Sequence, residues 1–203
     1  MADFDSILGS SAERIALAGL AVILWLAICL HAWYRQRAET GNPAGLLVAY
    51  ASQTGTAEAL ARTAVLQIGQ QTGNASGISV LPLNRIRPRH LLQTRRLLLV
   101  ISTTGQGAAP DNARLFVDRY LTGSRDLGHL EYAMLGLGDR RYQAFCGFAL
   151  ELDGWLCAHG ARRTGEVLLA DRSNPLVLAR WRDLIASMVG NADMAEAPAL
   201  AGE

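Results

Sequence analysis

The chain has 203 residues, half of them hydrophobic, and a formal net charge of only +1. This balance gives no general case for nucleic-acid binding, which would need a strong basic excess. Lysine is absent, which excludes a lysine Schiff base and the lysine of a P-loop. The three cysteines have no C-x-x-C spacing and no matching histidine pairs, so we expect neither a metal site nor a disulfide framework.

After an N-terminal tail, residues 1–14, the segment from Ile15 to Tyr34 contains no acidic residue and no arginine. A helix of that length covers roughly 30 Å, the thickness of a bilayer's hydrocarbon core. The sequence therefore predicts a single transmembrane helix at residues 15–34. Arg35 and Arg37 directly follow this segment and an acidic tail precedes it, so the positive-inside rule places the C-terminal side in the cytoplasm. The alternatives are a cleaved signal peptide, which would need a basic start, and a buried helix of a soluble domain.

Residues 35–45 are expected to form a linker, and from residue 46 to 190 short apolar runs alternate with amphipathic stretches. This alternation predicts an α/β domain with an open, doubly wound parallel sheet of five strands. The Ala-rich tail, residues 191–203, is expected to be disordered. The expected strands lie at residues 45–51, 77–83, 96–102, 132–138 and 166–170, and the expected helices lie at about 57–70, 111–121, 145–159 and 175–189.

Ligands of such sheets bind beyond the carboxyl ends of the strands. Three loops rich in glycine or polar residues follow expected strands: Ser52 to Ala57, Ser102 to Ala113 and Leu137 to Gly147. The first loop offers hydroxyls, backbone amides and a helix N-terminus, a combination that suits a phosphate. The simpler interpretation is a helix cap made by Thr54 or Thr56.

Together, the motifs SQTGTAE, STTGQGAAPDNA, LGDRRYQAFC and LLADRSNP…WRDLI resemble the FMN domain of the diflavin reductases. Within this family the resemblance is greatest to the flavoprotein subunit of sulfite reductase, and it covers about Leu46 to Val189. It implies a flavodoxin-like fold with strand order 2-1-3-4-5 and FMN as the cofactor, with no metal and no catalytic residue. The cofactor-binding residues that it implies are Ser52, Gln53, Thr54, Gly55, Thr56, Ala57, Ser102, Thr103, Thr104, Gly105, Gln106, Gly107, Leu137, Gly138, Asp139, Tyr142, Phe145, Cys146 and Asp171.

The chain departs from this family in two loops. Thr104 stands where cytochrome reductases usually have a tyrosine over the flavin, so we expect different redox potentials. The family's second loop is usually acidic, whereas here only Asp111 remains. The segment from Arg85 to Arg96 contains five arginines, which form either a solvated loop or a surface for anionic lipids or an acidic partner.

Relatives in the family continue into a module that binds FAD and NADPH, for which this chain has neither the length nor a G-x-G-x-x-G motif. We therefore expect a membrane-anchored FMN flavoprotein, facing the cytoplasm, that relays electrons between a partner reductase and an acceptor such as a haem protein. One alternative is a stand-alone NAD(P)H-dependent quinone or metal reductase. Another is an FMN-binding assembly or sensor subunit of a membrane complex.

Overall fold

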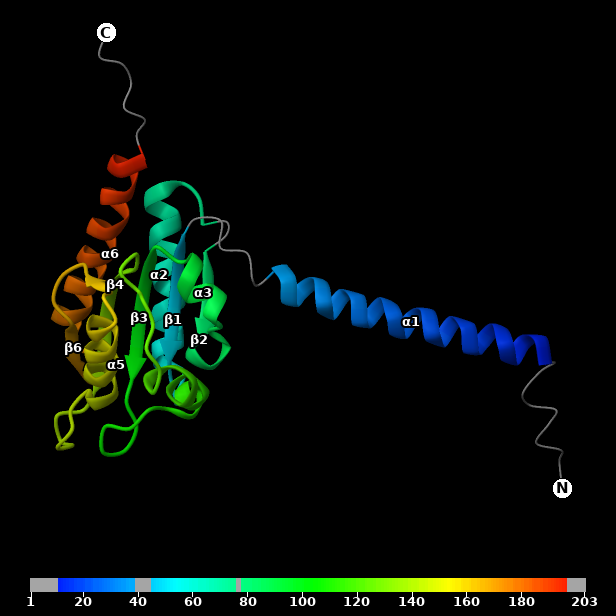
Figure 1. The fold of residues 1–203 in the computed structure, drawn as a ribbon, viewed down its shortest axis with the longest axis horizontal. Coiled ribbons are helices and arrows are strands. Elements are labelled where there is room, and N and C mark those ends of the chain that lie inside the picture. Colours follow the sequence, from blue (N-terminus) through cyan, green and yellow to red (C-terminus); the bar gives the residue numbers. More distant parts are fainter. Residues whose placement is uncertain (1–10, 39–44, 76–77, 197–203) are drawn as a thin grey trace, which may run out of the picture. The chain divides into compact units, whose positions relative to one another are not determined.

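A computed structural model describes residues 11–38, 45–75 and 78–196 of the chain (Figure 1). Side chains are described at residues 17–30, 45–75 and 78–190. The chain divides into two compact units, Met1–Gly41 and Asn42–Glu203. Most of the predicted N-terminal tail and the middle of the predicted linker lie outside the described residues.

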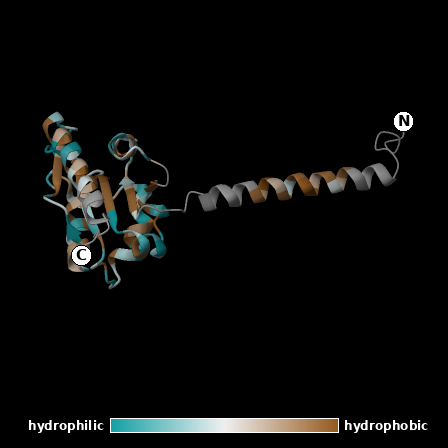
Figure 2. Ribbon diagram, turned by 90° about the horizontal axis from the view of Figure 1, so that it is seen from above, coloured by the Kyte–Doolittle hydropathy of each residue, from teal (hydrophilic) through white to brown (hydrophobic). Residues whose placement is uncertain are grey.

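The first unit contains one continuous helix, α1 (Ser11–Ala38). Every described side chain of this helix, from Leu17 to Leu30, is exposed, and the segment is largely apolar (Figure 2). Within the described part of the chain, no helix combines the length and the apolar character needed to cross a bilayer. The transmembrane helix predicted at residues 15–34 is thus not confirmed; the side chains at its two ends lie outside those described.

The second unit is built on a parallel sheet with the order β2-β1-β3-β4-β5, in which β6 also pairs with β4. This confirms the predicted α/β architecture and strand order. The strands are β1 (Leu46–Ala51), β2 (Ser79–Pro82), β3 (Arg96–Ser102), β4 (Glu131–Gly138), β5 (Arg162–Arg163) and β6 (Leu168–Asp171).

Helices cover both faces of the sheet, so the central strands are buried on both sides, as their continuous apolar runs predict. Alternate residues of β1 point to opposite faces: Leu47 belongs to the core under α5 (Gly147–Ala158), and Val48 to the core under α2 (Thr56–Thr72). The helix α6 (Pro175–Glu196) lies beside α2 and contributes Trp181 and Ile185 to the same core.

Three segments differ from the sequence prediction. The helix expected at 111–121 consists of a 3-10 turn, Asp111–Ala113, a single α turn, α4 (Arg114–Phe116), and a π-helical turn, Val117–Leu121. The arginine segment, expected to be a loop, contains a 3-10 turn, Leu83–Arg85, and the short helix α3 (Pro88–Gln93). The backbone of α6 continues to Glu196, into the tail that was expected to be disordered, and residues 197–203 lie outside the described residues.

The fifth position of the sheet holds two short strands in place of one, because β5 pairs with the start of β4 and β6 with its end. The strand predicted at 166–170 corresponds to β6. Both residues of β5 are exposed arginines, so no apolar pattern could reveal this strand.

Candidate functional site

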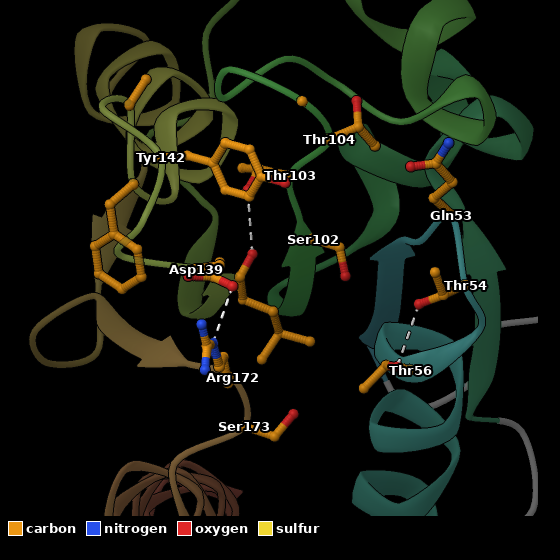
Figure 3. Close-up of a pocket in the computed structure, with 15 residues that line it drawn as sticks. Gln53, Thr54, Thr56, Ser102, Thr103, Thr104, Asp139, Tyr142, Arg172 and Ser173 are labelled. Atoms are coloured by element: carbon orange, nitrogen blue, oxygen red, sulfur yellow. Dashed lines mark hydrogen bonds and ion pairs between the residues drawn. The ribbon is translucent and has the colours of Figure 1, made fainter.

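The carboxyl ends of β1, β3, β4 and β6 surround an open cavity of about 290 Å³ (Figure 3). Four loops supply its walls, in agreement with the rule that ligands of parallel sheets bind at this edge. Its lining residues are Gln53, Thr54, Thr56, Ser102, Thr103, Thr104, Gly105, Leu137, Gly138, Asp139, Tyr142, Ala144, Phe145, Arg172 and Ser173.

The loop after β1 presents the start of α2 to the cavity. Gly55 is the N-cap of α2, with a left-handed φ of 88° that favours glycine, and no side chain caps the helix. The Thr54 and Thr56 hydroxyl oxygens lie 3.3 Å from each other. Neither caps the helix, so the alternative interpretation of a threonine cap does not hold. The first N–H groups of a helix have no partner inside it and carry the positive end of its dipole. With the two hydroxyls they fit a phosphate at this position.

Two asparagines hold this loop in place. The backbone N–H of Ser52 donates to Oδ1 of Asn112 at 2.9 Å. Asn84, in the turn after β2, donates from Nδ2 to the Asp111 carbonyl and accepts from the Leu115 N–H, both at 2.9 Å. Neither asparagine was predicted as a site residue. The PDNA motif contains Asn112 and could have indicated it, whereas Asn84 has no signal because its partners are distant in the sequence.

The loop after β3 is a tight turn closed between Thr104 and Ala108, whose backbone N–H and C=O groups exchange two hydrogen bonds of 2.9 Å. Gly105 lines the cavity, whereas Gln106 and Gly107 do not. Gly107 has a left-handed φ of 96°, and a Cβ added there would lie only 2.6 Å from the Cβ of Ala144. Gly107 therefore lets this loop pack against the loop after β4.

The loop after β4 is organised around the carboxylate of Asp139. Arg141 donates to Asp139 Oδ2 from Nη2 at 2.7 Å, and Arg172 donates to the same oxygen from Nε at 2.9 Å. The neighbouring Arg141 guanidinium, helped by Arg172, holds the pKa of Asp139 well below its usual range. Asp139 thus stays ionised between two cations. Tyr142, whose backbone N–H donates to the Asp139 carbonyl, is 45% exposed at the mouth of the cavity.

Phe145 and Cys146, at the end of this loop, have different positions. Phe145 lines the cavity, and the Arg140 guanidinium carbon lies 5.0 Å from the centre of its ring. Cys146 is fully buried, and burial raises the pKa of its thiol to about 12. A Cβ added at Gly138 would lie 2.8 Å from the Cys146 sulfur, so this thiol packs behind the end of β4.

The loop after β6 forms the fourth wall. Asp171 does not line the cavity; its Oδ1 accepts from the Arg140 N–H at 3.1 Å. Arg172 and Ser173, which follow it, do line the cavity and have left-handed φ values of 47° and 58°. Two such residues in succession cost about 1–2 kcal/mol each. Sequence reasoning missed both, because no residue type here signals a left-handed backbone.

The structure thus brings most of the predicted residues together around one cavity. The predicted residues that line it are Gln53, Thr54, Thr56, Ser102, Thr103, Thr104, Gly105, Leu137, Gly138, Asp139, Tyr142 and Phe145. The predicted residues that do not line it are Ser52, Gly55, Ala57, Gln106, Gly107, Cys146 and Asp171. No group of His, Cys, Asp or Glu side chains in the described ranges could hold a metal ion.

The cavity combines two chemical environments that suit one ligand. The helix N-terminus and the threonine hydroxyls suit an anion, and the glycine turn, Tyr142 and Phe145 suit a flat aromatic ring. A phosphate attached to an aromatic ring system, as in FMN, fits this arrangement.

Comparison with known proteins supports this interpretation. Residues 48–179 match the protein-family model described as flavodoxin. The chain is 33% identical over 161 residues to the flavoprotein alpha-component of NADPH sulfite reductase from Bacillus subtilis, covering 77% of this chain and 26% of that protein. The corresponding protein of Vibrio cholerae is 34% identical over 146 residues, with 71% and 23% covered. The chain therefore spans about a quarter of the length of these curated relatives.

Solved structures share the fold of the second unit. A short-chain flavodoxin associated with a non-canonical PDU bacterial microcompartment superposes with a TM-score of 0.62 at 20% identity, covering 72% of this chain and 97% of that one. The oxidised flavodoxin 2 of Bacillus cereus gives a TM-score of 0.57 at 22% identity, with 70% and 98% covered. At these identities the likeness concerns the fold alone.

Proposed function

Since the chain belongs to the flavodoxin family, whose domains bind FMN and transfer electrons, we propose that it is an FMN-carrying electron relay between two redox partners. The observation that carries this proposal is the start of α2, which faces the cavity with two hydroxyls and no side-chain cap. When bound, FMN supplies one- and two-electron redox chemistry, and the protein supplies binding and tuning.

Each wall of the cavity has a role in this proposal. Thr54, Thr56 and the first amides of α2 hold the phosphate, and the dipole of the helix compensates its charge without a basic residue. Tyr142, at the mouth of the cavity, would cover one face of the ring, and the backbone of the turn at Thr104 would approach its edge. That Thr104, in place of a tyrosine, alters the redox potentials stays a prediction. Asp139 holds the side chain of Arg172 at the wall of the cavity, where its positive charge would favour an added negative charge on a bound ring.

The relay is proposed to receive its electrons from a separate reductase and to pass them to an acceptor such as a haem protein. The test is anaerobic addition of NADPH to the FMN-loaded chain, first alone and then with ferredoxin–NADP⁺ reductase as a probe donor. We expect the flavin absorbance to bleach only after the reductase is added. Rapid bleaching by NADPH alone would contradict the relay and favour a stand-alone NAD(P)H-dependent quinone or metal reductase.

We also propose that α1 attaches the FMN domain to the cytoplasmic side of a membrane. The support is the run of exposed apolar side chains from Leu17 to Leu30, among them Trp25 at 63% exposure. The test is flotation of the full chain with lipid vesicles, compared with a Leu20→Asp/Leu24→Asp variant. We expect the wild type to float and the variant to stay in the aqueous phase. Self-association of the wild type without lipid binding would contradict this attachment.

The arginine segment supports a contact with anionic headgroups. Arg87, just before α3, and Arg89, within it, are exposed. An arginine near a charged membrane surface contributes about 1 kcal/mol to binding. We expect vesicles with anionic lipid to bind the chain more tightly than neutral vesicles, and high salt to abolish the difference. The Arg87→Ala/Arg89→Ala variant should lose this preference. Equal binding of variant and wild type to anionic vesicles would indicate that the arginines are merely solvated.

A further inference from the structure

We infer that an acidic redox protein docks over the mouth of the cavity, on a surface formed by Arg140, Arg141, Tyr142 and Arg172. This surface is called the arginine rim below. The inference rests on the proposed function, because it names the chemical class of the partner to which an electron relay passes electrons. A partner that exchanges electrons with a cofactor in this cavity has to approach its open side.

Two loops bring the rim together. Arg140, Arg141 and Tyr142 are consecutive in the loop after β4, and Arg172 follows β6. Their side chains reach solvent: that of Arg141 is 73% exposed and that of Arg172 is 57% exposed. Figure 3 shows Tyr142 and Arg172 on either side of Asp139 at the same wall of the cavity.

The acidic groups of this region lie behind the arginines. The Asp139 carboxylate, 18% exposed, accepts from both Arg141 and Arg172. Asp171 accepts from the backbone N–H of Arg140. Among the described hydrogen bonds, the one between Arg172 and Asp139 uses Nε of an arginine side chain that is 57% exposed. A partner therefore meets guanidinium groups first, and the cluster keeps a net positive charge.

The opposite side of the mouth does not offset this charge. The turn from Thr103 to Ala109 contains no charged residue. The acidic residue that follows it, Asp111, is paired with Arg114 at 3.2 Å. The mouth of the cavity is thus neutral on one side and basic on the other.

Exposed apolar groups lie among these charges. Tyr142 is 45% exposed, and Leu176, four residues beyond Arg172 at the start of α6, is 75% exposed. Tyrosine and arginine are the side chains that interfaces favour, and they dominate the binding energy in many complexes. Opposite charges on two partners accelerate their encounter, whereas like charges exclude the wrong partner. The rim therefore fits a partner with an acidic surface around its own redox centre.

The test uses two small haem proteins as probes, the acidic soluble domain of cytochrome b5 and the basic cytochrome c. The FMN-loaded full chain is photoreduced, and stopped-flow measurements follow the oxidation of its flavin at rising ionic strength. We expect the rate with cytochrome b5 to fall by about tenfold between low and high salt. The rate with cytochrome c should stay constant or rise, because salt screens repulsion.

Matched charge reversals locate the effect. Arg140→Glu should lower the low-salt rate with cytochrome b5 severalfold and raise the rate with cytochrome c. Arg95→Glu, the same change at an exposed residue before β3, should leave both rates at the wild-type value. Arg140→Gln serves if Arg140→Glu does not fold. Equal effects at both positions, or a faster reaction with cytochrome c that slows with salt, would overturn the inference.

A failure of the proposed function can be told apart from a failure of this inference. The FMN content of each preparation is measured by release of the flavin on denaturation. If the chain binds no FMN, calorimetric titration with cytochrome b5 at low salt still decides the inference. Weaker binding by Arg140→Glu than by Arg95→Glu supports the rim, and equal binding, or none to the wild type, contradicts it.

Discussion

The two ends of β4 each hold a carboxylate beside arginine, but the surroundings differ. At the amino end, Asp153 of α5 accepts from the Tyr132 hydroxyl at 2.5 Å and forms an ion pair with Arg163 Nε at 3.0 Å. At the carboxyl end, Asp139 lies between Arg141 and Arg172. The two carboxylates are similarly covered, 11% and 18% exposed. The tyrosine is fully buried, whereas the arginines at Asp139 reach solvent.

The different partners of Asp153 and Asp139 give the two carboxylates different roles. Burial, with the hydrogen bond to Asp153 as a further cause, raises the pKa of Tyr132 well above its usual range. The contact between Asp153 and Tyr132 joins α5 to β4 and stabilises their packing. The arginines around Asp139 can exchange protein contacts for water, a cofactor or a partner at little cost. Asp139 and its two arginines are therefore suited to binding a cofactor or a partner at the cavity.

The largest expected effect comes from removing the Asp153 carboxylate, which contacts Tyr132 and Arg163. Asp153→Ala should lower the free energy of unfolding by about 3 kcal/mol, because the buried Tyr132 hydroxyl loses its shortest hydrogen bond and Arg163 loses its counter-ion. The measurement is urea unfolding. Glu131→Ala, which removes the exposed partner of Arg162, is the control and should cost less than about 1 kcal/mol. Equal losses in both variants would show that Asp153 is an ordinary surface ion pair.

A backbone change in the loop after β3, at the edge of the sheet that carries the cavity, should affect FMN binding as well as stability. Gly107→Ala should cost about 2 kcal/mol, because its φ is left-handed and the new Cβ would collide with Ala144. FMN affinity should fall with it, since two walls of the cavity are pushed apart. Gly73→Ala, at the left-handed C-cap of α2 with open space around its Cβ and no part in the cavity lining, is the matched control and should keep the affinity. Flavin fluorescence titration measures both, and an equal loss in the two variants would contradict this packing role.

Acid should remove the contribution of Asp139. Because the folded-state pKa lies below the unfolded value of about 3.9, the stabilisation is present above that pH. It is lost as the pH falls further, toward the folded-state pKa. The wild type should therefore unfold at higher urea than Asp139→Asn at pH 6, and the difference should shrink below pH 4. A difference that persists unchanged at pH 3 would exclude an ionic origin.

The smallest effect expected is at Cys146. Its thiol is buried and its pKa is raised to about 12, so iodoacetamide at pH 8 should leave it unlabelled in the native chain. The same chain unfolded in urea is the control, in which Cys146 should label readily. Peptide mass spectrometry assigns the label to each cysteine. Fast labelling of Cys146 would mean that the thiol opens into the cavity.

The central part of the fold was predictable from the sequence. The runs that became β1, β3 and β4 are continuously apolar, as strands covered on both faces must be. Their loops stood out because glycines and hydroxyl side chains follow each run directly. The sheet order came from the family resemblance, and the structure confirms it.

Most features that the sequence did not predict depend on contacts between residues remote in the sequence or on backbone angles. The strand β5 has only two exposed arginines, so its pairing with β4 leaves no pattern. Arg172 and Ser173 line the cavity through left-handed angles that neither residue type signals. Asn84 reaches Leu115 across 31 residues of sequence. The helix α3 was missed because it lies in the arginine segment, whose charges suggested a solvated loop.

Titration of the purified full chain with FMN tests whether the start of α2 binds the phosphate of the cofactor. Free FMN is fluorescent, and a ring enclosed by Tyr142 and Phe145 should lose that fluorescence with a sharp end point at one FMN per chain. A Thr54→Ala/Thr56→Ala variant, which keeps the amides but not the hydroxyls, should bind more weakly while its affinity for the phosphate-free analogue riboflavin stays the same. No quenching by the wild type, or equal affinity for FMN and riboflavin, would contradict a phosphate site at the start of α2.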